Sequence, residues 1–73
     1  MGWQNGKKIV GLWAINENRN AWVYIQGLGW RKLADNFDSV VINLMTMSAH
    51  AKGKESNVNF REDGNMIKEM YVW

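Results

Sequence analysis

The chain of 73 residues has no cysteine and no proline, and it has only one histidine. The absence of cysteine excludes disulfides, thiolate zinc sites and a cysteine nucleophile. The single histidine, His50, excludes a metal site built from several imidazoles, so we expect neither a metal nor a cofactor. A domain this small buries only about 60% of the surface of its unfolded chain. Stability must therefore come from a well-filled core or from self-association.

Long apolar runs and a strong charge of one sign are also missing. No segment reaches the roughly 18 apolar residues of a membrane-spanning helix, and Met1–Lys8 lacks the apolar stretch of a signal peptide. Nine basic and seven acidic residues leave a net charge of +2. That surplus is too small to indicate a nucleic-acid or membrane surface by itself. The cellular compartment stays open.

Apolar material is plentiful. Hydrophobic residues make up 47% of the chain, charged residues 22%, and five residues are tryptophan. This composition favours a folded chain over a disordered one, and we expect residues 1–73 to form one small domain. Five large flat side chains in so short a chain are either packed in a core or presented to a ligand.

The first half of the chain predicts three strands. Lys7–Asn16 and Ala21–Gln26 are rich in β-forming residues and flank the polar turn Asn16–Asn20, which predicts a hairpin. Gly11 inside the first run indicates a bulge or a close approach of backbone. After a bend rich in glycine, Trp30–Leu33 forms a short third strand.

The middle of the chain predicts one helix, Asp38–Lys52. Its apolar positions recur with helical spacing on one face: Val40, Val41, Leu44, Met47, Ser48 and Ala51. Candidate N-caps precede and open it: Asp35, Asn36 and Asp38. Gly53 is expected to end the helix in the left-handed conformation.

The end of the chain returns to strand. Asn57–Phe60 and Met66–Trp73 flank the turn Glu62–Asn65, whose Asp-Gly pair is a strong hairpin signal. Strands, one helix and two more strands define an α+β fold. Two closures are open: an antiparallel sheet with the helix on one face, or a small barrel of the oligonucleotide/oligosaccharide-binding (OB) type with the helix between its third and fourth strands.

Catalytic residues are not recognisable in this pattern. His50 lies near the predicted end of the helix, where a histidine typically compensates the helix dipole. Ser39 and Ser48 have no base nearby in the sequence, and Glu62 and Asp63 belong to a turn. We therefore expect a binding protein and not an enzyme.

The tryptophans carry the binding hypothesis. Trp30 follows a glycine-rich bend and is expected to be exposed, while Trp13 and Trp22 share the predicted hairpin and are open to either a core or a binding role. An indole offers a flat apolar face to a sugar ring and an N–H to a polar partner. Asn16, Asn18 and Arg31 are the expected partners of the hydroxyl groups or of an acidic group.

The end of the chain predicts self-association. Tyr71 and Trp73 are apolar at a terminus, where side chains are usually polar and frayed. Together with the adaptable side chains of Met45 and Met70 they are expected to form an interface between copies of the chain. Filling of the core by the methionines is the alternative.

The stretch from Asp35 through Ser39–Met45 to Met70–Trp73, in the order helix, strand, turn and strand, resembles the C-terminal half of the B subunits of AB5 bacterial toxins. Leu12–Asn16 and Gly29–Leu33 look similar to segments of small lectin repeats. The toxin resemblance implies an OB fold, assembly into a ring, secretion and binding of cell-surface glycans, and leaves open whether a catalytic partner chain exists.

The sequence departs from the toxin subunits in three respects. It is shorter, it has no cysteine for the disulfide that many of them carry, and Phe60–Asp63 has no tryptophan where the cholera-type subunits stack one on galactose. Their sugar site therefore does not carry over.

Two other functions use the same residues. Bases of a single-stranded nucleic acid can stack on the tryptophans while lysines and arginines follow its phosphates, although the interspersed acidic residues disfavour this reading. A purely structural assembly unit needs no ligand at all. The sequence favours glycan binding by a homo-oligomer.

Overall fold

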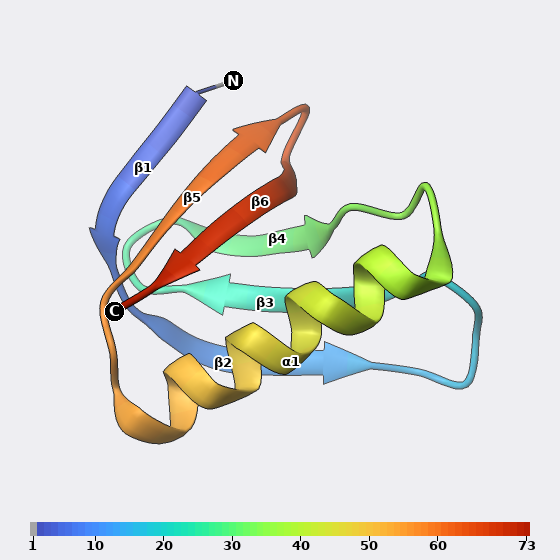
Figure 1. The fold of residues 1–73 in the computed structure, drawn as a ribbon, viewed down its shortest axis with the longest axis horizontal. Coiled ribbons are helices and arrows are strands. Elements are labelled where there is room, and N and C mark those ends of the chain that lie inside the picture. The colour runs from blue at the N-terminus through green and yellow to red at the C-terminus, as the bar shows by residue number, and fades with distance from the viewer. Residues whose placement is uncertain (1) are drawn as a thin grey trace.

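The computed structural model describes residues 2–73 and consists of one helix and a sheet of six strands (Figure 1). The predicted α+β class is confirmed. The elements are β1 Gly2–Lys7, β2 Ile9–Ala14, β3 Ala21–Ile25, β4 Gly29–Leu33, α1 Asp38–Lys54, β5 Val58–Asp63 and β6 Met66–Val72.

The sheet is mixed and open. Its order is β1-β5-β6-β4-β3-β2, and only the contact between β4 and β6 is parallel. The strands β2, β3 and β4 run across the view of Figure 1, and β1, β5 and β6 cross it obliquely, as in a strongly twisted sheet. The two edge strands, β1 and β2, are consecutive in the chain and are separated by Lys8 alone. The sheet is not closed into a barrel.

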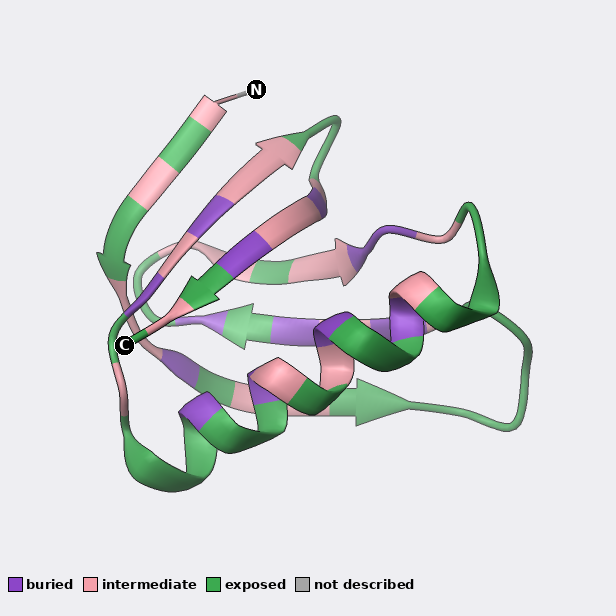
Figure 2. Ribbon diagram, viewed as in Figure 1, coloured by how far each residue is buried: buried purple, intermediate pink, exposed green. Residues whose placement is uncertain are grey.

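One face of the sheet and α1 enclose the core. The buried side chains of β3 are Ala21, Val23 and Ile25, which alternate with the more exposed Trp22 and Tyr24. Figure 2 shows a similar alternation of buried and less buried residues in the first part of β5. The remaining buried apolar side chains are Ile9, Leu33, Ala34, Val41, Leu44, Ala51, Val58, Phe60, Ile67 and Met70. The aromatic residues of β3 consequently lie on the face that α1 does not cover.

The helix follows the predicted face and begins at the predicted Asp38, but its N-cap and its C-terminal end differ from the prediction. Its buried residues are Val41, Leu44, Ser48 and Ala51, as the apolar spacing predicts. The N-cap is Phe37, which makes no side-chain capping bond, so the expectation of a cap from Asp35, Asn36 or Asp38 was wrong. The helix passes through Gly53 and ends two residues later than expected. Glu55 is the left-handed C-cap, with φ 54°, and its N–H reaches the carbonyls of Ala51 and Lys52.

The last hairpin has the predicted turn and an unpredicted irregularity. Gly64 and Asn65 both have positive φ, 61° and 65°, as a two-residue turn between paired Asp63 and Met66 requires. The register shifts between Arg61 and Glu62, which pair with Glu69 and Ile67. Lys68 is the extra residue of this bulge. Ile67 and Met70 are therefore both buried, although simple alternation would place them on opposite faces.

The first strand was not predicted. The sequence of β1, Gly-Trp-Gln-Asn-Gly-Lys, has two glycines and three polar residues, so it lacks the pattern of a strand. It pairs with β5 far along the chain, Gly2 with Glu62 and Lys7 with Val58. Pairing with a distant strand overrides the weak local preference.

Candidate functional site

Three tryptophans from three adjacent strands meet on the face of the sheet opposite α1. Trp13 of β2, Trp22 of β3 and Trp30 of β4 line a concavity of about 530 Å³ together with Asn20. Trp13 and Trp30 are 42% and 46% exposed, so a large part of each ring faces solvent. We call these four residues the tryptophan groove. Its volume lies within the range of small-ligand sites.

The register of the strands explains why these rings meet. Trp13 and Trp22 are opposite each other in the β2–β3 pair, and residues opposite each other in antiparallel strands point to the same face. Trp30 pairs with Tyr24, two residues further along β3 on that face. The alternation that buries Val23 and Ile25 under α1 thus delivers the large aromatic side chains to the other side.

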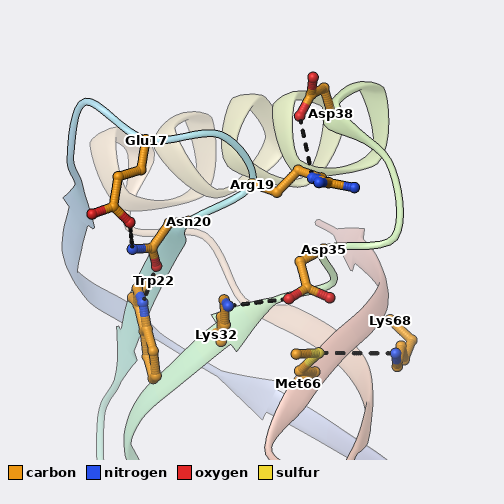
Figure 3. A network of polar contacts seen from close by, with 9 residues as sticks. All are labelled: Glu17, Arg19, Asn20, Trp22, Lys32, Asp35, Asp38, Met66 and Lys68. Carbon is orange, nitrogen blue, oxygen red and sulfur yellow. Dashed lines mark hydrogen bonds and ion pairs between the residues drawn. The ribbon is translucent and has the colours of Figure 1, made fainter.

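Trp22 is held by hydrogen bonds from the β2–β3 loop. Its indole Nε1–H donates to Asn20 Oδ1 at 2.8 Å, and Asn20 Nδ2 donates to Glu17 Oε1 at 2.9 Å. Figure 3 shows this chain of contacts, with the ring of Trp22 extending away from the loop. Because both ends of the Asn20 amide are engaged, the Trp22 ring is fixed in one orientation before any ligand arrives.

Two neighbours position the ring of Trp30: Tyr24 of β3 and Gly11 of β2. The edge of one ring faces the other in the Tyr24–Trp30 pair, with centroids 5.3 Å apart and an interplanar angle of 90°. Gly11 of β2 lies close to both. A Cβ at that position would be 3.0 Å from Tyr24 Cβ and 3.7 Å from Trp30 Cη2. The bulge between Ile9 and Gly11 and the absence of a side chain at Gly11 make room for the Trp30 ring.

A polar concavity adjoins the tryptophan groove and shares Asn20 with it. It measures about 410 Å³ and is lined by the β2–β3 loop, by Lys32 of β4 and by Asp35 after it; the loop residues are Glu17, Asn18, Arg19 and Asn20. We call this set the polar rim. Lys32 Nζ lies 3.1 Å from Asp35 Oδ2, and Arg19 Nε lies 3.8 Å from Asp38 Oδ1 (Figure 3). The hydrogen bond from Lys32 lowers the pKa of Asp35. The charges of the rim are therefore largely matched in pairs.

Arg31 lies away from the tryptophan groove. It is opposite Val23 in the β3–β4 pair, hence on the core side of the sheet. Its Nε donates to Glu62 Oε1 at 2.9 Å, and the two side chains are only 18% and 12% exposed. Gln4 donates to the other oxygen of the same carboxylate. The hydrogen bond from Arg31 is the main cause that lowers the pKa of Glu62.

Asn18 lies in the polar rim, beside Asn20. Asn16 is exposed in the same loop but does not line the tryptophan groove. The structure thus brings together Trp13, Trp22 and Trp30, places Asn18 next to them, and separates Arg31 from them.

The residues expected at an interface lie in different surroundings. Met70 is buried, with its sulfur 3.8 Å from Ser48 Oγ, and Met45 packs partly buried against the core. Tyr71 and Trp73 are exposed, at 51% and 70%. Their rings lie nearly parallel with centroids 6.1 Å apart. Of these four residues, Tyr71 and Trp73 are therefore the exposed ones.

Sequence reasoning counted Asn20 among the polar residues of the hairpin but did not identify it as the partner of Trp22. It considered Lys32 only as a contact for phosphates and Asp35 only as a helix cap. Asn20 lies two residues before Trp22, on the same side of the strand, and that spacing was the available signal. The alternation of a strand also separates Arg31 from its neighbour Trp30.

Within residues 2–73, no three acidic or histidine side chains come together as ligands of a metal ion. The helix α1, of 17 residues, is too short and too polar to cross a membrane. Comparisons with family models, with curated proteins and with solved structures found no match to this chain.

Proposed function

We propose that the protein is a non-enzymatic carbohydrate-binding domain whose ligand stacks on the tryptophan groove. The observation that carries the proposal is the convergence of Trp13, Trp22 and Trp30 on one concavity with Asn20 at its rim. The rings of Trp13 and Trp30 offer apolar faces to the C–H face of a pyranose. The ring of Trp22 is held in place by Asn20 and needs no ordering on binding.

The polar rim would bind the hydroxyl groups of the same ligand. An amide donates to and accepts from hydroxyls, and a carboxylate accepts from them; Asn18, Glu17 and Asp35 provide these groups beside the groove. Since Lys32 pairs with Asp35 and Arg19 with Asp38, the rim offers no unmatched cluster of charge. This balance favours a neutral saccharide over an acidic one.

We further propose an OB-like arrangement for the sheet. If β1 and β2 are counted as one strand bent at Lys8, the chain has five strands with α1 between the third and the fourth. In OB folds the face of the second and third strands and the loop before them bind oligosaccharides or oligonucleotides. The corresponding elements here are β3, β4 and the loop 15–20, which carry Trp22, Trp30 and Asn20.

Nucleic acid remains the second candidate, because bases also stack on indole rings. The charges near the tryptophan groove disfavour it. The basic residues of β4, Arg31 and Lys32, are paired with Glu62 and Asp35, and the net charge of the chain is only +2. A single-strand channel would need unpaired cations along the groove.

The test is a glycan array followed by titration of the strongest neutral glycan, monitored by tryptophan fluorescence. Trp30→Ala should weaken binding by about tenfold or more, which is the loss expected of one stacking ring. Asn20→Ala should weaken it less, since it frees the Trp22 ring without removing it. The control is Ile42→Ala, an exposed apolar residue of α1.

Thermal unfolding followed by circular dichroism would establish that each variant is folded. A folded Trp30→Ala protein that keeps the affinity of the unmodified chain would refute the proposal. So would an array on which no neutral glycan is bound.

A further inference from the structure

A second cluster of exposed aromatic rings comes from the other half of the sheet, from strands β1 and β6. Trp3 of β1, Tyr71 of β6 and Trp73 beyond its end line a concavity of about 480 Å³ with Asn5 and Asn59. We call these five residues the terminal patch. It shares no residue with the tryptophan groove or with the polar rim.

Strand pairing holds the terminal patch together. Asn59 is opposite Tyr71 in the β5–β6 pair, so both point to the same face. Asn5 follows Trp3 by two residues in β1, and Trp73 follows Tyr71 by two, so each pair shares a face as well. The backbone N–H of Trp73 donates to the carbonyl of Asn57 at 3.0 Å. This backbone hydrogen bond holds Trp73 against the sheet.

The rings of the terminal patch form one aromatic row. Tyr71 and Trp73 are stacked at an angle of 9°, and Trp3 lies 5.7 Å from Tyr71 at 43°. The exposed fractions of Trp3, Tyr71 and Trp73 are 44%, 51% and 70%. A row of exposed apolar rings is costly in water unless something covers it.

The polar groups of the terminal patch are uncharged: the amides of Asn5 and Asn59, the hydroxyl of Tyr71 and the indole N–H groups. Asn59 Oδ1 accepts a hydrogen bond from the backbone N–H of Gly6 at 2.9 Å. That bond fixes the orientation of the amide and leaves its Nδ2 hydrogens as donors. Asn5 is exposed beside it. No charged side chain lines the concavity. Flat rings and uncharged amides match the C–H faces and hydroxyl groups of a neutral sugar.

The extent of the terminal patch argues against a second copy of the chain as its occupant. A stable interface between proteins needs roughly 20–30 residues on each side, whereas five side chains line this concavity. The neighbouring Arg61–Glu69 ion pair has side chains that are 40% and 46% exposed, as expected for a surface in contact with water. A concavity of this volume suits a ligand of one or a few sugar rings.

We infer that the terminal patch is a second binding site for neutral saccharides, so that a single chain is bivalent. The inference rests on the proposed function for the class of ligand, but it stands on different residues. A bivalent chain can link two glycan chains, or bind two points of one, and gain affinity through effective concentration.

The experiment is isothermal titration calorimetry, which measures the number of binding sites and their affinities, with neutral hexasaccharides of glucose, N-acetylglucosamine and mannose as probes. The unmodified chain should bind at two sites. Trp73→Ala and Tyr71→Ala should each weaken one site by about tenfold and leave the other. Trp30→Ala should weaken the other site and leave this one, and Trp30→Ala combined with Trp73→Ala should weaken both sites by about tenfold. Phe37→Ala, which removes an exposed ring outside both sites, is the control.

The outcomes separate this inference from the proposed function. One site that is lost in Trp30→Ala and unchanged in Trp73→Ala overturns the second site and keeps the first. One site that is lost only in Trp73→Ala overturns the tryptophan groove as a site and keeps the terminal patch. The absence of any binding overturns both proposals. Light scattering completes the test: a mass well above 8.5 kDa that falls to this value in Trp73→Ala, with saccharide binding unchanged, assigns the terminal patch to a second copy.

Discussion

At the scale of the residue, one little-exposed ion pair joins strands that are distant in the chain. Arg31 of β4 and Glu62 of β5 form a mostly buried ion pair, and Gln4 of β1 completes the coordination of the carboxylate. Breaking such a pair leaves an unmatched charge in poorly hydrated surroundings. Glu62 is therefore expected to matter more for stability than exposed acids of the same type.

Glu62→Gln should lower the free energy of unfolding at neutral pH by about 1–3 kcal/mol. The folded-state pKa of Glu62 lies below its ordinary value of 4.5, because Arg31 and Gln4 favour the carboxylate. Its contribution is complete above pH 4.5 and is lost as the pH falls through the lowered folded-state pKa. Denaturant unfolding between neutral and acidic pH should show this loss in the unmodified chain and less of it in Glu62→Gln.

The matched control is Glu69→Gln, since Glu69 pairs with Arg61 at an exposed position. That substitution should cost less than about 1 kcal/mol. Equal costs for the two variants would contradict the burial argument.

Gly11 is the residue on which the position of Trp30 depends. Gly11→Ala places a methyl group 3.0 Å from Tyr24 Cβ, so the pair of Tyr24 and Trp30 must shift. We expect a change in tryptophan fluorescence, severalfold weaker binding at the tryptophan groove and a loss of stability of about 1 kcal/mol. Gly53→Ala, where a Cβ meets open space, is the control and should change neither spectrum nor affinity.

At the scale of the element, the sequence pattern predicted those features of the fold that depend on local interactions. The apolar spacing of α1 and the Asp-Gly-Asn turn were found from sequence because both depend on residues a few positions apart. The strand β1 was missed because its pairing with the distant β5 creates it. The bulge at Arg61–Glu62, in the local hairpin of β5 and β6, was missed because simple alternation was assumed along Met66–Trp73. The sequence also did not reveal that Trp22 and Tyr24 lie on the face of the sheet away from α1. Both faces of β3 are apolar, and the packing of α1 determines which face is buried.

The end of α1 provides a test at this scale. Glu55 has a side chain in a left-handed conformation that glycine adopts at little cost. Glu55→Gly should therefore raise the free energy of unfolding by about 0.5–1 kcal/mol, measured with denaturant. The same change at the preceding residue, Lys54→Gly, lies inside the helix and should lower it by a similar amount. A loss of stability in Glu55→Gly would show that its side chain has a role that the cap geometry does not explain.

At the scale of the whole molecule, the charge distribution separates the two ligand classes. The net charge is +2, and ion pairs engage Arg19 and Lys32 in the polar rim beside the tryptophan groove. Affinity for a neutral glycan should change less than about twofold between about 50 and 500 mM NaCl, because few counterions are released. A single-strand ligand held by about four phosphate contacts would weaken several hundredfold over the same range. Fluorescence titration with a neutral hexasaccharide and with an oligothymidylate of about 12 nucleotides makes the comparison. Tight binding of the oligothymidylate that depends steeply on salt, with no binding of the saccharide, would assign the tryptophan groove to nucleic acid.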